Sequence, residues 1–178
     1  AASDVYKRQL DGPSENWELG TRDTGSYATL SDVVEYLEWL GEKVESTNNR
    51  TKKLTNAAKA IAAQETSLTE LMINGQDNIK GLKDLEGIEI IGGEKNPNRK
   101  GLVSFRIVDS PSQEIVDFLN VNGIRTHVRK ADHYSGNILN PLGWEDCVRV
   151  SVCHYNSSEE IKSLLLALNE FQMKLPTN

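Results

Sequence analysis

The segment from Asp132 to Asn156 concentrates residue types that could do chemistry. It contains both cysteines of the chain, two of its three histidines, and Arg149, which stands between two valines. Polar and apolar positions alternate from Cys147 to Cys153, and this alternation predicts a β-strand with a valine face and a polar face. Arg149 would then project from a rigid strand on the face away from the core. A guanidinium held in this way can bind a carboxylate or a phosphate through two hydrogen bonds. The alternative is a structural salt bridge, and the sequence leaves both open.

Other kinds of chemistry fit this segment poorly. The histidines have no metal-ligand spacing with the cysteines, and no serine lies in a G-x-S-x-G setting. No P-loop occurs. Cys147 and Cys153 lie about 20 Å apart along an extended strand, whereas a disulfide needs Cα atoms within about 7 Å. We therefore expect free thiols and no metal site.

Apolar spacing predicts the elements that position these residues. Helices are expected over about 30–44, with Thr29 or Ser31 as a cap and Gly41 as a possible break, and over about 49–72. Residues 10–26 read as an extended loop, and the helical pattern fails around residues 73–78. From residue 88 the predicted order is β-β-α-β-β-α, with helices on one face of a small sheet. The expected ranges are strands at 88–91, 102–108, 124–128 and 147–153, a helix at 110–121, and a last helix opened by a capping box at Ser157 and Glu160.

Composition narrows the class of protein. The 178 residues carry a formal net charge of −6, which argues against nucleic acid as a partner. No apolar run reaches the length of about 20 residues that a membrane span needs, and no secretory signal is recognisable. We expect a cytoplasmic protein. Residues 1–9 (AASDVYKRQ) resemble translated adapter sequence, so we expect them to be non-native and the natural chain to extend further upstream.

Three segments, in this order, resemble class V aminotransferases and cysteine desulfurases, which are fold-type-I enzymes dependent on pyridoxal 5'-phosphate. Trp17–Gly41 (WELGTRDTGSYATLSDVVEYLEWLG) resembles their F-E-x-G-T stretch and the helix after it. Residues 123–139 (GIRTHVRKADHYSGNIL) resemble their loop before the active site. Residues 147–161 (CVRVSVCHYNSSEEI) resemble their R-x-S-x-x-x-Y-N-[ST]-x-E-E motif. The resemblance covers nearly all of residues 10–175.

The resemblance implies a fold, a cofactor and site residues. Residues 10–45 would end the large cofactor-binding domain, and residues 46–178 would form the small C-terminal α+β domain. Pyridoxal 5'-phosphate would bind at the interface of a homodimer, where Gly20 and Thr21 would hold the phosphate of the partner's cofactor. Arg149 would bind the α-carboxylate of an amino-acid substrate, with Arg129 as a second arginine near the substrate.

The resemblance also carries two departures. The loop with His133 and Tyr134, which would lie beside the substrate, is about two residues longer than the family form. The catalytic cysteine of desulfurases would fall on or beside Tyr134, whereas Cys147 and Cys153 lie on the following strand. We therefore expect a class V aminotransferase-like enzyme, such as a transaminase, lyase or epimerase, that lacks persulfide chemistry. The lysine that forms the Schiff base would lie upstream of Leu10, so this chain alone should be inactive.

Two alternatives remain at this stage. The first is a non-catalytic α+β small-molecule-binding or regulatory domain, in which Trp17–Thr21 would have no purpose. The second is a degenerate homologue that kept the fold and lost the cofactor.

Overall fold

The structure of this protein is a computed structural model that describes residues 24–174. The chain divides into two compact units, residues 1–58 and residues 59–178. The predicted boundary between residues 45 and 46 stays a prediction. None of the helices in the described part is long and apolar enough to cross a bilayer.

Helix α2 (Thr24–Val44) and the first turns of helix α3 (Arg50–Asn74) belong to the first unit. The predicted loop was wrong at residues 24–26, which are already helical. Neither Thr29 nor Ser31 is a cap, because their hydroxyls donate back to the carbonyls of Gly25 and Tyr27, respectively, within the helix. The next helix, α3, does have a cap: the side chain of Asn49 accepts a hydrogen bond from the Lys52 amide at 2.9 Å.

Gly41 does not break α2, as the sequence suggested it could. The helix continues through it to Val44, and Gly41 is buried. A Cβ at this position would lie 1.8 Å from the carbonyl oxygen of Lys53. The glycine therefore lets α2 and α3 approach closely, and ion pairs flank the contact, joining Glu38, Glu42 and Glu45 to Arg50, Lys53 and Lys52, respectively.

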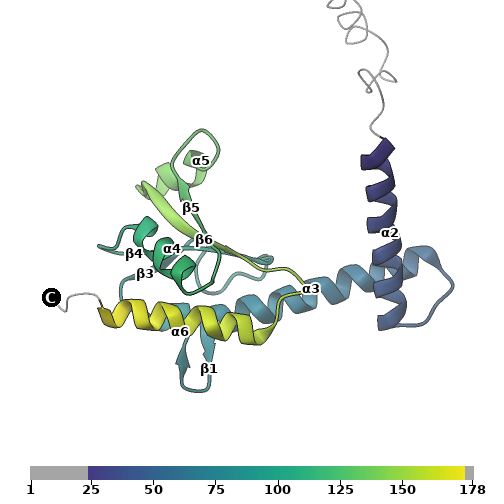
Figure 1. Ribbon diagram of the computed structural model, residues 1–178, viewed down its shortest axis with the longest axis horizontal. Coiled ribbons are helices and arrows are strands. Elements are labelled where there is room, and N and C mark those ends of the chain that lie inside the picture. The colour runs from purple at the N-terminus through teal and green to yellow at the C-terminus, as the bar shows by residue number, and fades with distance from the viewer. Residues whose placement is uncertain (1–23, 175–178) are drawn as a thin grey trace, which may run out of the picture. The chain divides into compact units, whose positions relative to one another are not determined.

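The second unit is built on a four-stranded antiparallel sheet of order β3-β4-β6-β5 (Figure 1). Its strands are β3 (Ile88–Ile90), β4 (Leu102–Ile107), β5 (His127–Lys130) and β6 (Asp146–Ser151). Helices α4 (Ser112–Val121) and α6 (Ser158–Lys174) complete the predicted β-β-α-β-β-α order. A short helix α5 (Gly136–Leu139) and a 3-10 turn η2 (Asn140–Leu142) lie between β5 and β6. A hairpin of β1 (Gly75–Gln76) and β2 (Ile79–Lys80), then η1 (Leu82–Asp84), follow α3.

The core lies on one face of this sheet, as predicted. Val103 and Phe105 of β4 and Val148 of β6 are fully buried there, and Val150 is nearly so. They belong to one apolar cluster with side chains of α3, α4 and α6. Burying each large apolar side chain contributes about 1.5–3 kcal/mol, so this face fixes which residues of β4, β5 and β6 point away from the helices.

Several strand boundaries differ from the prediction, and two of the differences have clear local reasons. The third strand begins at His127 rather than at residue 124, because Gly123 (φ 75°) ends α4 in the left-handed region and the Ile124 amide bonds back to the Leu119 carbonyl at 2.9 Å. The fourth strand ends at Ser151 rather than at Cys153. The Cys153 amide leaves the ladder because the side chain of Asn156 accepts its hydrogen bond at 2.8 Å.

The capping box that opens α6 is confirmed. The Ser157 amide donates to the Glu160 carboxylate at 2.7 Å, and the Glu160 amide donates to the Ser157 hydroxyl at 3.3 Å. The Ser157 amide, together with the Asn156 side chain, lowers the pKa of Glu160. The capping box thereby sets the start of α6 at Ser158.

Candidate functional site

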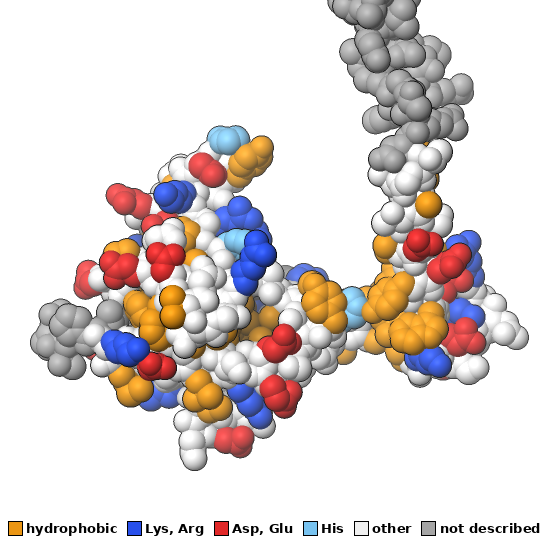
Figure 2. Space-filling view, in the orientation of Figure 1, with side chains coloured by type: hydrophobic (Ala, Val, Ile, Leu, Met, Phe, Trp, Pro, Cys, Tyr) orange, Lys and Arg blue, Asp and Glu red, His pale blue; other side chains and the backbone are white. Residues whose placement is uncertain are grey.

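The sheet has a polar face on the side away from the core, where polar residues of three strands lie together. The register places Arg149 of β6 between Ser104 of β4 and His127 of β5. Arg129 of β5 is the partner of Cys147. Because directly paired residues share a face, these five side chains lie on one surface. Figure 2 shows basic side chains and a histidine gathered beside β5 and β6.

A small apolar cluster covers part of this polar face. Leu139, Trp144 and Cys147 are buried together, with Ile91 and Ala131 packed against them. The guanidinium of Arg106 lies 4.4 Å from the centre of the Trp144 ring. Arg106 also pairs with Glu89 across the β3–β4 ladder. This cluster anchors the segment between β5 and β6 on the sheet.

Arg149 combines a rigid position with an unused donor. It is half-buried on an inner strand, and its Nε atom is shielded from solvent with no hydrogen-bond partner among residues 24–174. A shielded donor without a partner is costly, more so on a charged group. An anion with two oxygens would satisfy this donor and the guanidinium charge together. The salt-bridge alternative is not realised within the described residues.

Cys147 lies among charged side chains that act on the pKa of its thiol. The residue is 2% exposed, and burial raises the pKa of its thiol, with Asp146 adding to the effect. A hydrogen bond with Ser104 and the charges of Arg129 and Arg149 act in the opposite direction. Both guanidiniums therefore act on this buried sulfur, but burial dominates, so Cys147 is a poor nucleophile.

The turn after β5 holds the other two predicted substrate residues. Asp132 accepts hydrogen bonds from the amides of Tyr134 and Ser135, each at 2.9 Å, and these bonds lower its pKa. The rings of His133 and Tyr134 lie 4.0 Å apart, and Tyr134 is 78% exposed. The structure thus brings Arg129 to the same face as Arg149 and leaves His133 and Tyr134 on an exposed turn.

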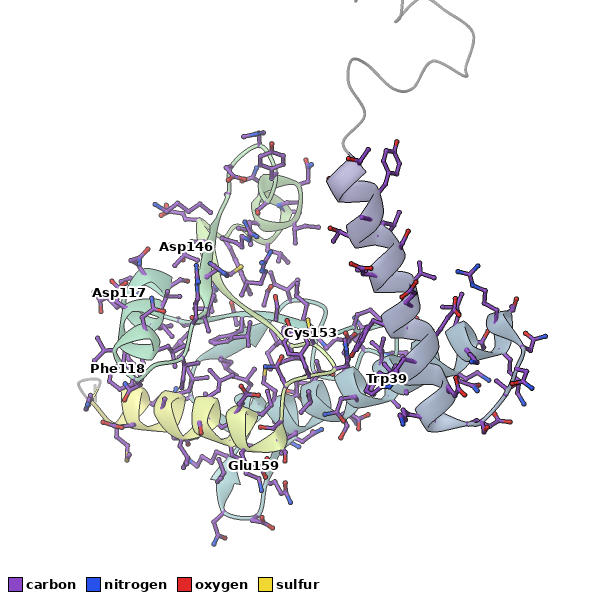
Figure 3. The ribbon with its side chains drawn as sticks, turned by 45° about the vertical axis from the view of Figure 1, so that its right-hand side comes forward. Trp39, Asp117, Phe118, Asp146, Cys153 and Glu159 are labelled. Atoms are coloured by element: carbon purple, nitrogen blue, oxygen red, sulfur yellow. The ribbon has the colours of Figure 1, made fainter. Side chains whose placement is uncertain are left out.

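The second cysteine lies beyond the end of β6. Figure 3 labels Asp146 at the start of this strand and Cys153 past its other end. Cys153 follows Arg149 by four positions, about 13 Å along an extended chain. Both cysteines are free thiols, and the described residues contain no group of three or more side chains that could hold a metal ion.

A shallow groove of about 370 Å³ runs along the outer edge of β5. It is lined by residues of α4 and β5, among them His127 and Arg129, and by Thr126 and Asp132 on either side of β5, but it does not include Arg149. We place the site on the polar face rather than in this groove, because the shielded Nε of Arg149 belongs to the polar face. Gly20 and Thr21, the predicted cofactor residues, lie outside the described residues.

His127 and Ser104 were not recognised as site residues in the sequence. Alternation puts His127 and Arg129 on one face of their own strand, and that much was readable. Which residue of another strand stands opposite each of them depends on the pairing register, for which the sequence has no local signal.

Residues 2–164 match the family described as Aminotransferase class-V. Among curated proteins, the chain is similar to a probable cysteine desulfurase of Xylella fastidiosa, with 26% identity over 88% of this chain and 31% of the relative. It is also similar to one of Pseudomonas putida, with 32% identity over 64% of this chain and 25% of the relative. This chain therefore spans no more than about a third of these relatives.

Among solved structures, the chain resembles an apo cysteine desulfurase of Thermococcus onnurineus with a TM-score of 0.68. That likeness covers 92% of this chain and 34% of the solved chain, at 23% sequence identity. It confirms the predicted fold.

Proposed function

The chain belongs to the class V aminotransferase family, and on this premise we propose that it forms the substrate-carboxylate side of a pyridoxal-phosphate-dependent enzyme that acts on an amino acid. Arg149 binds the α-carboxylate of that amino acid. The observation that carries the proposal is the Nε of Arg149, which is shielded on a central strand and has no partner among the described residues. Its position fixes the orientation of a bound carboxylate, because β6 is hydrogen-bonded on both sides.

The described residues fit the amino-acid end of such a complex. Ser104 and His127 flank Arg149 and can contact a ligand bound to it. Pyridoxal phosphate, when bound, supplies the electron sink for reactions at the substrate Cα. Gly20 and Thr21 would hold the phosphate of the partner's cofactor in a homodimer, as the family resemblance implies.

We propose transaminase or lyase-type chemistry rather than persulfide formation, although the relatives named above are cysteine desulfurases. A persulfide mechanism needs a thiolate that can reach the substrate sulfur. Burial raises the pKa of Cys147, and Cys153 lies about 13 Å along the chain from Arg149. Tyr134 stands at or beside the expected cysteine position.

Residues 10–175 alone should bind an amino acid without converting it. The resemblance places the cofactor lysine outside these residues, so this chain supplies orientation and charge but not the covalent attachment of the cofactor. Binding is therefore the property to measure on the chain itself.

The test is a titration of the ¹⁵N-labelled protein with L-alanine and with L-alaninamide, which lacks the carboxylate, followed at the Arg149 Nε–Hε resonance. L-Alanine should shift this resonance with millimolar affinity and L-alaninamide should not. Hydrogen bonds to charged groups contribute about 1.5–3 kcal/mol, so Arg149→Gln should weaken binding about 10- to 150-fold.

Arg106→Gln is the matched control, because Arg106 projects from the neighbouring strand but is already paired with Glu89. It should bind L-alanine as the unaltered protein does. Equal responses to L-alanine and L-alaninamide, or binding that survives Arg149→Gln, would remove Arg149 from the role proposed for it.

A further inference from the structure

Strand β3 forms one edge of the four-stranded sheet and pairs only with β4. Across this ladder the Ile91 amide donates to the Ser104 carbonyl at 2.9 Å. Hydrogen-bonded and non-hydrogen-bonded pairs alternate along an antiparallel ladder, so the backbone groups of every second residue of β3 face β4. The backbone groups of Ile88 and Ile90 therefore face outward, away from the sheet.

Local turns already use half of these outward groups. The Ile90 carbonyl accepts a hydrogen bond from the Gly93 amide at 3.0 Å. The Ile88 amide reaches the Leu85 carbonyl at 3.5 Å. The Ile88 carbonyl and the Ile90 amide are left without a hydrogen-bond partner among residues 24–174. One residue of a parallel strand bridges such a pair, because its slanted hydrogen bonds reach an acceptor and a donor two residues apart on the neighbouring strand.

Apolar side chains reach this edge on the core face of the sheet. Ile88 and Ile90 are half-buried and pack against the main apolar cluster. Together with Gly93 and Glu94 they line a groove of about 320 Å³ beside the strand. Natural edge strands are commonly blocked by lysine or proline, and residues 87–91 (GIEII) contain neither. The edge therefore presents an apolar groove next to unpaired backbone groups.

A second copy of this chain fits the edge poorly. Two copies related by a two-fold axis across their edges would pair β3 with itself in the antiparallel direction, whereas the free groups suit a parallel strand. That pairing would also set the two Glu89 residues directly opposite each other, with Cα atoms about 4.5 Å apart, and like charges in this position are destabilising. Arg106 pairs with Glu89 from the inner side, on β4, so it does not separate the two carboxylates.

We propose that β3 is a docking edge for an extended segment of a partner protein, which adds to the sheet as a parallel strand. One residue of that segment lies opposite Glu89, donates its amide to the Ile88 carbonyl and accepts the Ile90 amide. The residues on either side of it point to the core face and cover the groove, so they are apolar. Main-chain hydrogen bonds give such strand addition its affinity, and the alternate side chains give it specificity. The proposal does not depend on the role of Arg149.

The experiment titrates the ¹⁵N-labelled chain with synthetic peptides. The probe is acetyl-Gly-Val-Thr-Val-Gly-amide, which has two valines around a polar residue. It should shift the Ile90 amide resonance with a dissociation constant on the order of 1 mM and slow the exchange of this amide with solvent. A methyl group on the threonine nitrogen removes the donor to the Ile88 carbonyl, so it should weaken binding about tenfold or more.

The matched control peptide carries its methyl group on the nitrogen of the second valine. That nitrogen faces away from β3 in the proposed pairing, so this peptide should bind as the unmethylated probe does. In the protein, Ile88→Thr keeps a β-branched side chain that suits a strand but removes apolar surface from the groove, and it should weaken binding about two- to fourfold. Val121→Thr alters an exposed apolar side chain on α4 and should leave binding unchanged.

Several outcomes would refute the docking edge. The first is a probe that leaves the Ile90 resonance unchanged, and the second is equal binding of the two methylated peptides. An equal shift of the Val128 amide, which faces outward on the other edge strand β5, would show that the peptide adds to any free edge. A concentration-dependent dimer of the chain that Ile88→Thr disrupts would show that a second copy covers the edge instead.

Discussion

Gly101 is the position where a single methyl group should separate the two inner strands of the sheet. It lies directly before β4, and a Cβ there would stand 2.2 Å from the carbonyl oxygen of Val152, after β6. The Gly101 carbonyl accepts a hydrogen bond from the Val152 amide at 2.7 Å. Both approaches occur at the end of the β4–β6 ladder that continues through the pair of Ser104 and Arg149.

The cost of Gly101→Ala follows from these contacts. The added atom meets backbone rather than a flexible side chain, and forcing an extra carbon into a packed site costs about 1–3 kcal/mol. Loss of the hydrogen bond to Val152 adds about 0.5–1.5 kcal/mol. We expect Gly101→Ala to lower the free energy of unfolding by about 2–4 kcal/mol, which is a large part of the 5–15 kcal/mol that holds a typical domain.

Gly93→Ala is the matched control for this prediction. Gly93 has φ of 74°, but nothing lies within 4 Å of a Cβ built on it. It should therefore show only the cost of a left-handed alanine, about 1–2 kcal/mol. Comparing the two substitutions separates backbone strain from steric contact.

Urea unfolding, followed at the indole resonance of Trp144, measures both variants. With an m-value of about 2 kcal/mol/M, Gly101→Ala should lower the midpoint by about 1–2 M and Gly93→Ala by about 0.5–1 M. Gly101→Ala should also shift the Arg149 Nε–Hε resonance in the folded protein. A Gly101→Ala midpoint equal to or above that of Gly93→Ala would refute the argument that close strand approach requires this glycine.

Two further predictions concern ionisable groups. Cys147 is buried with a raised pKa whereas Cys153 is only half-buried, so iodoacetamide should modify Cys153 more than about tenfold faster in the native protein; peptide mass spectrometry measures this, and equal rates would contradict the burial of Cys147. The amide of Ser157 and the side chain of Asn156 lower the pKa of Glu160, so its carboxylate stabilises the fold above the unfolded value of about 4.3 and loses that contribution as pH falls through the folded pKa. The difference in urea midpoint between the unaltered protein and Glu160→Gln should therefore shrink as the pH is lowered from about 6 to about 3, a range that spans the carboxyl pKa. A difference that stays constant over this range would argue against the capping-box role.

Much of the architecture is readable from sequence because it depends on local patterns. Alternating valines around Arg149 define the buried face of β6, and the Ser157–Glu160 spacing defines the start of α6. The family motifs are equally local, and the class V aminotransferase match confirms the family that they indicated. Each of these signals is carried by neighbouring residues along one strand or one helix turn, so no other part of the chain is needed to interpret it.

Local patterns were insufficient where a distant segment decides the outcome. Gly41 looked like a helix break, yet α2 continues through it, and the glycine is needed because a Cβ there would collide with the Lys53 carbonyl. The strand predicted from residue 124 starts later because Ile124 completes the end of α4.

The candidate site shows the same division between sequence and tertiary structure. The sequence by itself determined that Arg149 projects from the polar face of a strand, because side-chain alternation is a property of one extended segment. Only the tertiary structure decided that His127 and Arg129 stand beside it, with Ser104 on its other side. Strand order and register are set by how β4, β5 and β6 bury their apolar faces together, and that cooperative packing has no signature in any single segment.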